Sequence, residues 1–353
     1  MPLATLYCLR AAKAQTDIYV LNGKVGRKMR LGKYIGKRVT LAFFTLLIMV
    51  TIVFFMFRVI PGDPISMYID QGLDQESQQL MMEMYGLDKS VPEQYAIYLK
   101  GLFVGDMGRS FTYSKPVAEV IGERFLNTLV LTTTSLMIAF TVGITGGSYL
   151  AWHRGTKLDL FGTILALIIR CAPVFWTGMI LLSVFAFKLE WLPLGGMTTV
   201  GSDFNSFFDK IFSFDFLKHL ILPALTSALY SMATPTLLMR TSMLEVVKED
   251  YVELAFAKGL TEKQIRRRHA MRTALLPVVT IFAVQAGLAI GGSVLVETVF
   301  RWPGMGREIV LAVGARDYPM AQGAFLFIGL ATITFNLIAD ILYAYLDPRV
   351  SLD

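Results

Sequence analysis

The residue types that carry most enzyme chemistry are sparse in this chain and form no familiar catalytic pattern. The three histidines, His153, His219 and His269, stand far apart, and the sequence contains neither HExxH nor GxSxG. It also lacks a GxxxxGK[ST] phosphate loop, so energy from ATP would have to come from a partner. Cys8 lies in a polar tail and Cys171 in an apolar segment, a poor arrangement for a disulfide or a metal site.

A few polar residues lie inside long apolar segments, where charge is costly and usually faces a cavity or a partner. Arg170 precedes Pro173 by three residues, and the proline should kink its helix or free a carbonyl group. Arg170 either lines a pore or pairs with another helix. Asn336 and Asp340 lie one helical turn apart and share a face, so they either fix helix contacts or belong to a gate.

The overall composition indicates a membrane protein. Of 353 residues, 54% are hydrophobic and 17% are charged, whereas soluble domains carry about 25% charged residues. The mean hydropathy is +0.55. The formal charge of +6 could suggest nucleic acid as a partner, but in a membrane protein basic residues normally mark cytoplasmic loops. We therefore expect a lipid bilayer, and no nucleic acid, around this chain.

Six segments reach the length of about 20 apolar residues that a membrane-spanning helix needs. They are 39–60, 127–151, 159–187, 218–243, 273–297 and 320–345. The sequence thus predicts an all-α polytopic membrane protein with about six transmembrane helices. The second and fifth segments contain Gly143-xxx-Gly147 and Gly287-xxx-Gly291, a spacing that lets helices pack closely within a bundle.

The distribution of Lys and Arg predicts the orientation. The basic residues before the first span place the N-terminus in the cytoplasm. Arg154 and Lys157 then fall inside, the acidic stretch 61–126 falls outside, and the basic cluster 263–272 falls inside. Because every loop agrees, we expect both termini in the cytoplasm. Arg240, which closes the fourth span, is expected to anchor it at the membrane interface.

This orientation divides the chain into four parts: a cytoplasmic basic extension (1–38), the first span with a structured outer loop (39–126), a five-helix core (127–346) and a cytoplasmic C-terminus (347–353). The first 28 residues lack the apolar core of a cleaved signal peptide. In the outer loop, DQESQQLMMEMYGL and EQYAIYLKGLF predict two short helices separated by Pro92.

The segment between the fourth and fifth spans is too polar for lipid yet favours helix. Gly259 interrupts this helix at a natural C-terminal position. Thr261, with Gln264 three residues later, forms a capping box that opens a second helix. The sequence therefore predicts a cytoplasmic helix, a sharp corner and another helix held between two spans.

One side of the first of these helices combines an aromatic ring with small and apolar groups. Tyr251, Leu254, Ala255 and Lys258 recur at intervals of three and four residues. Ala255 and Gly259 would keep this side flat enough to enter a groove on a partner. The alternative is a plain amphipathic helix at the membrane surface.

The same stretch carries a resemblance to a known family. EDYVELAFAKGLTEKQIRRRHAMRTALLPVV is similar to the EAA loop of binding-protein-dependent ABC importers, in the form found in oligopeptide and dipeptide permeases; here the loop covers about 245–277. Glu253, Ala255 and Gly259 match the family pattern, whereas Leu254 replaces its usual alanine. Further similar strings occur in the same order as in the family: RVIPGDP, YGLDKSVPEQY, GDMGRSF, VETVFRWPGMGRE, RDYPMAQG and DILYAYLDPRV.

The resemblance implies a permease subunit in the bacterial inner membrane that forms half of a pore. Its partners would be a second homologous permease, two cytoplasmic ATPases that bind ATP and Mg²⁺, and an extracytoplasmic solute-binding protein. The coupling helix would then present Tyr251, Glu253, Leu254, Ala255, Lys258 and Gly259 to an ATPase. Glu297 and Arg301, at the outer end of the fifth span, either contact the binding protein or are rim charges without a role. No cofactor is implied on this chain.

Several alternatives remain open at this point. The family includes importers of dipeptides, oligopeptides, glutathione, nickel chelates and some oligosaccharides. An ion-coupled secondary transporter would show inverted repeats and membrane-embedded acidic residues, which are not evident beyond Asp340. An intramembrane hydrolase would need a nucleophile with a base, or metal ligands at helical spacing.

Overall fold

The computed structural model describes residues 36–58, 88–204, 206–289 and 294–346, with side chains of the last segment described to residue 338. Within these ranges the chain is helical, and its β-structure is one isolated bridge between Arg109 and Pro116. In the described ranges, five helices are long and apolar enough to cross a membrane: Gly36–Arg58, Val117–Trp152, Phe214–Val246, Glu262–Ala289 and Tyr318–Ile338. The bent pair Lys157–Cys171 and Val174–Lys188 makes a sixth candidate if it counts as one span. The all-α polytopic fold is therefore confirmed.

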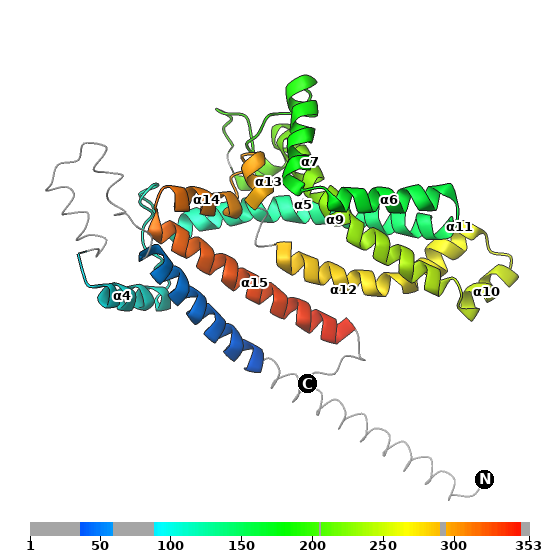
Figure 1. Ribbon diagram of the computed structural model, residues 1–353, viewed down its shortest axis with the longest axis horizontal. Coiled ribbons are helices and arrows are strands. Elements are labelled where there is room, and N and C mark those ends of the chain that lie inside the picture. Colours follow the sequence, from blue (N-terminus) through cyan, green and yellow to red (C-terminus); the bar gives the residue numbers. More distant parts are fainter. Residues whose placement is uncertain (1–35, 59–87, 205, 290–293, 347–353) are drawn as a thin grey trace, which may run out of the picture.

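The helices α5 (Val117–Trp152) and α9 (Phe214–Val246) form the long axis of the bundle and lie side by side (Figure 1). Small residues allow this approach. A Cβ added at Gly147 would lie 2.3 Å from the Thr236 carbonyl oxygen, and one at Gly143 would lie 2.7 Å from Pro235 Cγ. The predicted packing role of the Gly143-xxx-Gly147 pair is therefore confirmed.

The third expected span is not one continuous helix. The helices α6 (Lys157–Cys171) and α7 (Val174–Leu181), the latter continued by the π-helical η1 (Leu182–Lys188), meet at an angle of 100°. Pro173 explains the break, because it lacks an N–H and forces Ala172 into an extended conformation with φ −69° and ψ 133°. The expected span 159–187 therefore corresponds to a bent helix pair rather than to one straight helix, and the predicted effect of Pro173 is confirmed.

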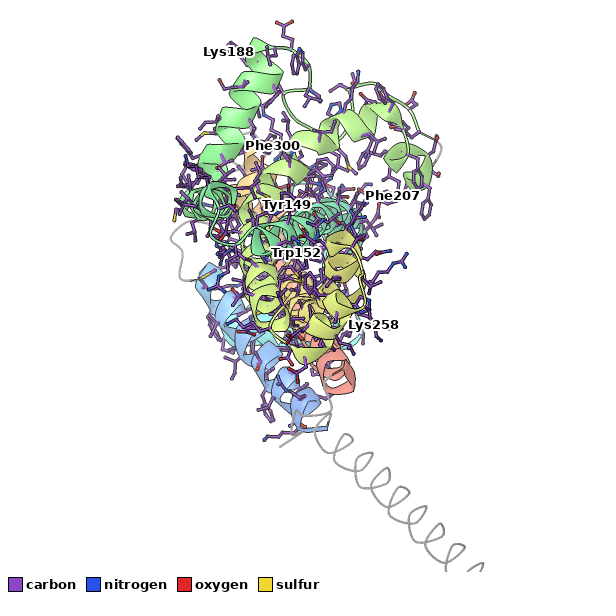
Figure 2. All side chains as sticks on the ribbon, turned by 90° about the vertical axis from the view of Figure 1, so that its right-hand side faces the viewer. Tyr149, Trp152, Lys188, Phe207, Lys258 and Phe300 are labelled. Carbon is purple, nitrogen blue, oxygen red and sulfur yellow. The ribbon has the colours of Figure 1, made fainter. Side chains whose placement is uncertain are left out.

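As a consequence, α7 and η1 project from the bundle as an arm (Figure 1). Lys188 lies near the tip of this arm in the view of Figure 2.

The fifth expected span also differs from the structure. Its helix begins earlier, as α11 (Glu262–Gln264) and η2 (Ile265–Ala270), and continues as α12 (Met271–Ala289). A separate short helix, α13 (Val294–Val299), follows. The second and fourth spans extend beyond 127–151 and 218–243 as α5 and α9, and the last is α15 (Tyr318–Leu346).

The end of the bundle near the start of α5 carries the shorter helices α4 (Val91–Phe103) and α14 (Met305–Gly314) (Figure 1). The helix α4 confirms the second of the two predicted loop helices, whereas the first falls outside the described residues. Ser90 and Glu93 form a capping box that fixes the start of α4. The small helix α8 (Phe207–Ile211) precedes α9.

Among the described residues, three clusters of buried apolar side chains hold the bundle together. One joins α5, α9 and α12 to the segment that follows α9. A second joins the first helix and the start of α5 to α14 and α15, and a third joins the middle of α5 to α9 and α13. The first of these clusters positions the candidate site.

Candidate functional site

The segment after α9 folds into the predicted helix, corner and helix. The helix α10 (Asp250–Ala257) follows a short turn, and Gly259 then adopts φ +72°, a conformation that favours glycine. Thr261 begins the next helix, and its backbone N–H and its hydroxyl group donate to Gln264 Oε1 at 3.0 and 2.8 Å. Both the glycine corner and the capping box are therefore confirmed.

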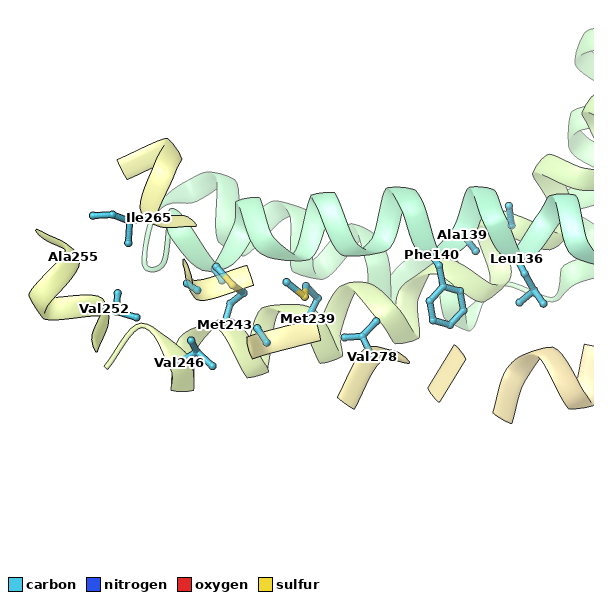
Figure 3. Close-up of a cluster of buried hydrophobic side chains, with 14 residues drawn as sticks. Leu136, Ala139, Phe140, Met239, Met243, Val246, Val252, Ala255, Ile265 and Val278 are labelled. Atoms are coloured by element: carbon cyan, nitrogen blue, oxygen red, sulfur yellow. The ribbon is translucent and has the colours of Figure 1, made fainter. Parts of the chain in front are cut away.

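One face of α10 packs against the bundle. Val252 is fully buried and Ala255 is 4% exposed, and both belong to the cluster that contains Met239 and Met243 of α9 and Ile265 of η2. Figure 3 shows these side chains in one continuous core between the corner and the long helices. The expectation that Ala255 lies on the partner-facing side was wrong. Its small side chain instead lets α10 pack closely against its own chain.

Polar and aromatic contacts add to this packing. Trp152, at the end of α5, stacks on Phe256 with ring centroids 6.2 Å apart and donates from Nε1 to Glu262 Oε2 at 3.0 Å. On the other side, the Tyr251 hydroxyl group bonds to Thr273 Oγ1 of α12 at 2.9 Å. The helix α10 is thus joined to α5 and α12 as well as to α9.

Away from Val252 and Ala255, α10 exposes Leu254, and Tyr251 and Phe256 on its flanks stay partly exposed despite their contacts with α12 and α5. Leu254 is 54% exposed, Phe256 46% and Tyr251 40%. Glu253 and Lys258 are exposed beside them, and Lys258 lies at the outer edge of the bundle in Figure 2. A short helix that is rigidly held on one face and apolar on the other is suited to docking into a groove on a partner.

Two basic loops meet at this end of the bundle. The turn between α5 and α6 carries Arg154 and Lys157, and Trp152 at its start contacts the corner. The corner itself carries exposed Lys263, Arg267 and Arg268. Two loops that are distant in sequence therefore present positive charge at the same end of the molecule.

Comparison with known proteins assigns the family. The family described as "Binding-protein-dependent transport system inner membrane component" matches residues 143–352, and the N-terminal region described for such membrane components matches residues 31–134. The chain belongs to this family. The resemblance inferred from the EAA loop is therefore confirmed, and the protein is a multi-pass permease of the ABC importer class.

Named relatives cover nearly the whole chain. It is 37% identical over 321 residues to the oligopeptide transport system permease protein AppB of Bacillus subtilis, covering 91% of this chain and 99% of AppB. It is 33% identical over 328 residues to the dipeptide transport system permease protein DppB of Alkalihalophilus pseudofirmus, covering 90% and 98%. It is 36% identical over 317 residues to the glutathione transport system permease protein GsiC of Salmonella typhimurium, covering 90% and 98%.

A solved structure supports the same fold. An inward-facing form of the MetNI methionine ABC transporter aligns with a TM-score of 0.50 and 16% identity, over 65% of this chain and 97% of the transporter chain. The family assignment and the named relatives favour the permease over an ion-coupled secondary transporter or an intramembrane hydrolase.

In this permease, Arg170 lies in the last turn of α6, directly before the break at Pro173. Its guanidinium group stands 4.4 Å from the centre of the Tyr230 ring on α9, a cation–π contact. Both Arg170 and Pro173 are exposed. The structure thus gives Arg170 a partner on another helix, and a role in lining the pore stays a prediction.

The predicted gate residues lie on α15. Asn336 packs against Gly287 of α12, because a Cβ at Gly287 would lie 3.0 Å from Asn336 Oδ1. The side chain of Asp340 lies outside the described residues, as does Gly291. The Asn336 contact fits the expected role in helix packing, and the gate role stays a prediction.

Glu297 does not lie on the rim as expected. It is fully buried on α13, where it accepts hydrogen bonds from Thr128 Oγ1 at 2.8 Å and from the Arg307 backbone N–H at 2.9 Å. Gly304 and Gly306 make room for its carboxylate, since a Cβ at either would lie within about 3 Å of it. A direct contact with a binding protein is therefore excluded for Glu297 in this conformation, whereas Arg301 is exposed.

Sequence reasoning missed the ion pair between Arg240 and Asp159. Arg240 donates to both carboxylate oxygens of Asp159, from Nε at 2.6 Å and from Nη2 at 2.8 Å. Arg240 therefore joins α9 to the start of α6, and its role as an anchor at the membrane interface stays a prediction. A buried carboxylate at the start of one span and an arginine at the end of another were the available signal, but the sequence does not show that these helices are neighbours.

Proposed function

We propose that this permease is one of two homologous subunits that form the pore of an ATP-driven importer, and that α10 is the surface on which a cytoplasmic ATPase acts. The observation that supports this proposal is the two-sided character of α10. Its inner face is buried against the long helices, whereas Glu253 and Leu254 are exposed on its outer face. The proposed contact surface comprises Tyr251, Glu253, Leu254, Phe256, Lys258 and Gly259, with Ala255 as the packing residue behind it.

The contacts of α10 connect this surface to the membrane-spanning helices. Trp152, Thr273 and the buried cluster tie α10 to α5, α12 and α9. Movement of α10 would therefore displace all three helices rather than unfold a loop. ATP would favour one state of the pore only through a difference in affinity between the two states.

We infer the orientation of the chain in the membrane from its basic loops. Positive charge from the 153–157 turn and from the 263–272 segment lies at one end of the bundle, and such loops normally face the cytoplasm. We therefore place α10 and both termini in the cytoplasm. The end that carries α4 and α14 would then face a solute-binding protein, with Arg301 as a candidate contact.

Two functions of the importer would depend on partner subunits: ATP binding and completion of the pore. ATP and Mg²⁺ would be bound by the two ATPase subunits, since this chain has no phosphate-binding loop. The projecting arm α7–η1 exposes large apolar side chains such as Phe175, Trp176 and Phe187, which suits burial in lipid or against the second permease.

The solute is proposed to be a small peptide. The relatives are named for oligopeptide, dipeptide and glutathione transport, and all three are peptides with at least one free carboxylate. Nickel chelates and oligosaccharides remain the alternatives within the broader family.

Uptake of radiolabelled dialanine, a tripeptide and glutathione into cells with and without this chain tests the function. We expect uptake of at least one peptide to require the chain, to stop when ATP is depleted and to persist when an ionophore collapses the ion gradients. Uptake that survives ATP depletion but is abolished by the ionophore would instead indicate a secondary transporter.

A further inference from the structure

A cavity of about 380 Å³ lies between the start of α6 and the last turns of α9. Lys157, Asp159, Leu160 and Arg240 are among the residues that line it. The start of α6 lies at the end of the bundle that carries α10 (Figure 1), but none of these side chains belongs to the proposed ATPase contact surface. The proposed function therefore leaves this cavity without a role.

The charged residues of the cavity leave one positive charge uncompensated. Arg240 donates to both carboxylate oxygens of Asp159, from Nε at 2.6 Å and from Nη2 at 2.8 Å, so these two side chains neutralise each other. Lys157 is the third charged residue that lines the cavity, and it is exposed. The Arg240 side chain is itself 25% exposed, and its Nη1 takes no part in the pair with Asp159. Both cations are thus accessible to a ligand, and a single negative charge would balance the site.

The cavity lies at the depth at which a membrane presents its lipid headgroups. Between His219 and Arg240, α9 contains 20 residues without a charged side chain, 220–239. At 1.5 Å per residue this stretch is about 30 Å long, which matches the thickness of the hydrocarbon core. Arg240 therefore stands where the hydrocarbon ends. Lys157 is the first residue of α6 and begins the bent candidate span, so it lies at the same boundary.

An apolar row on α6 begins at the cavity and leads away from this boundary. Leu160 lines the cavity, and Ile164 and Ile168 follow it at intervals of four residues on the same side of the helix. The exposed fractions of these three side chains are 57%, 41% and 60%. Basic groups at the start of an exposed apolar row match the two parts of a phospholipid, a charged headgroup and an acyl chain.

We infer that this cavity binds the headgroup of an anionic phospholipid, with Lys157 and Arg240 in contact with its phosphate and one acyl chain along the row that Leu160 begins. The phosphodiester carries one negative charge, which equals the charge that the cavity leaves uncompensated. Ammonium and guanidinium groups are the side-chain groups that bind phosphate in proteins. A bound lipid would contact both α6 and α9 and would therefore stabilise their packing at this end of the bundle.

Native mass spectrometry of the full-length chain in a non-ionic detergent tests this inference. The probes are phosphatidylglycerol, phosphatidylcholine with the same acyl chains, and glycerophosphoglycerol, which is the phosphatidylglycerol headgroup without its chains. We expect retention of phosphatidylglycerol to exceed that of phosphatidylcholine, whose headgroup carries its own positive charge, and glycerophosphoglycerol to be lost. Equal retention of the two lipids would overturn the inference, and so would retention of glycerophosphoglycerol equal to that of phosphatidylglycerol.

Matched variants connect retention to the cavity. Lys157→Gln should weaken retention of phosphatidylglycerol about fivefold, the effect of one basic residue at an anionic membrane surface, whereas Lys157→Arg should preserve it. Lys248→Gln is the control, because Lys248 is also an exposed lysine at this end of the bundle but does not line the cavity. Equal retention by Lys157→Gln and Lys248→Gln would overturn the inference.

Arg240 is tested together with Asp159, because removal of the arginine alone would leave a buried carboxylate without its partner. The double variant Arg240→Gln with Asp159→Asn keeps the net charge of the cavity but removes the guanidinium group. Retention of phosphatidylglycerol should fall several-fold in this variant. Retention equal to that of the unmodified chain would overturn the assignment of Arg240 as a phosphate contact.

Thermal unfolding supplies a second readout. Without added lipid, Lys157→Gln and Lys248→Gln should melt at the temperature of the unmodified chain, since both lysines are exposed. Added phosphatidylglycerol should raise the melting temperature of the unmodified chain and of Lys248→Gln more than that of Lys157→Gln, because a ligand that binds more tightly stabilises the folded state more. The same rise in all three proteins would overturn the inference.

Discussion

Trp152 and Glu262 join two segments that are 110 residues apart in sequence, through a 3.0 Å hydrogen bond from the indole Nε1 to a carboxylate oxygen. This bond connects the last turn of α5 to the first turn after the Gly259 corner. Trp152 also stacks on Phe256 of α10. One side chain thus contacts both sides of the corner, so the corner and α5 should move together.

Loss of this hydrogen bond should reduce the coupling between ATP hydrolysis and transport more than it reduces the stability of the fold. In Trp152→Phe the hydrogen bond is lost while an aromatic ring remains, and the exposed site limits the cost to stability to about 1 kcal/mol. We expect the amount of peptide transported per ATP hydrolysed to fall several-fold in proteoliposomes that contain the complete transporter. Glu262→Gln, which can still accept the bond, should behave nearly as the unmodified protein. An unchanged transport ratio in Trp152→Phe would contradict this role.

The two faces of α10 should respond differently to truncation. Val252→Ala removes two methyl groups from a fully buried position and should lower the free energy of unfolding by about 1–3 kcal/mol. Leu254→Ala changes a side chain that is 54% exposed and should alter stability by only about 0.5 kcal/mol. In contrast, Leu254→Ala should reduce assembly with the ATPase subunit.

Thermal unfolding and co-purification with the ATPase separate these two effects. Normal co-purification of Leu254→Ala would show that Leu254 is not part of the contact surface.

The local features of this corner could be predicted from the sequence because each depends on neighbouring residues. Gly259 ends a helix through its own backbone conformation, and Thr261 caps the next helix through a residue three positions later. Pro173 likewise breaks its helix locally.

Features that depend on distant segments could not be predicted in the same way. The helical spacing places Ala255 near Leu254, but it does not show which side meets the rest of the bundle. Glu297 is buried because Thr128 and two glycines form its site, and the pairing of Arg240 with Asp159 depends on how α9 packs against α6. The sequence does not show which helices are neighbours, so neither pairing could be predicted from it.

Gly259 offers a test of the corner with a close internal control. Its φ of +72° penalises any residue with a Cβ, although no atom lies within 4 Å of the added group. Gly259→Ala should therefore cost about 1 kcal/mol through backbone strain alone. Gly155, in the turn between α5 and α6, has φ +78° and the same open space.

Gly155→Ala should show the same loss in thermal unfolding as Gly259→Ala. Only the Gly259 variants should uncouple ATP hydrolysis from uptake, and Gly259→Asp, which adds charge at the proposed interface, should do so most strongly. Equal uncoupling by Gly155→Ala would indicate general destabilisation rather than a specific corner.

The buried Glu297 should contribute to the stability of the fold rather than to contact with the solute-binding protein. In Glu297→Gln one acceptor oxygen is replaced by an amide, which must face either Thr128 Oγ1 or the Arg307 backbone N–H. The lost bond should lower the free energy of unfolding by about 1–3 kcal/mol.

The comparison is the exposed Arg301→Ala, which should leave the melting temperature nearly unchanged while reducing affinity for the solute-binding protein. If Glu297→Gln reduced the affinity for the solute-binding protein and left the melting temperature unchanged, Glu297 would be a contact for that protein after all.

Site-directed crosslinking tests whether α10 contacts the ATPase subunit. In a chain with Cys8 and Cys171 replaced by serine, Leu254→Cys is labelled in native membranes with a short reagent that carries a maleimide at one end and a photoreactive benzophenone at the other. We expect a crosslinked product with the ATPase subunit, whereas Val252→Cys, at a fully buried position, should give none. If a membrane-impermeant maleimide added to the outer surface labels Leu254→Cys instead, α10 lies outside the cytoplasm and cannot be the contact surface for the ATPase.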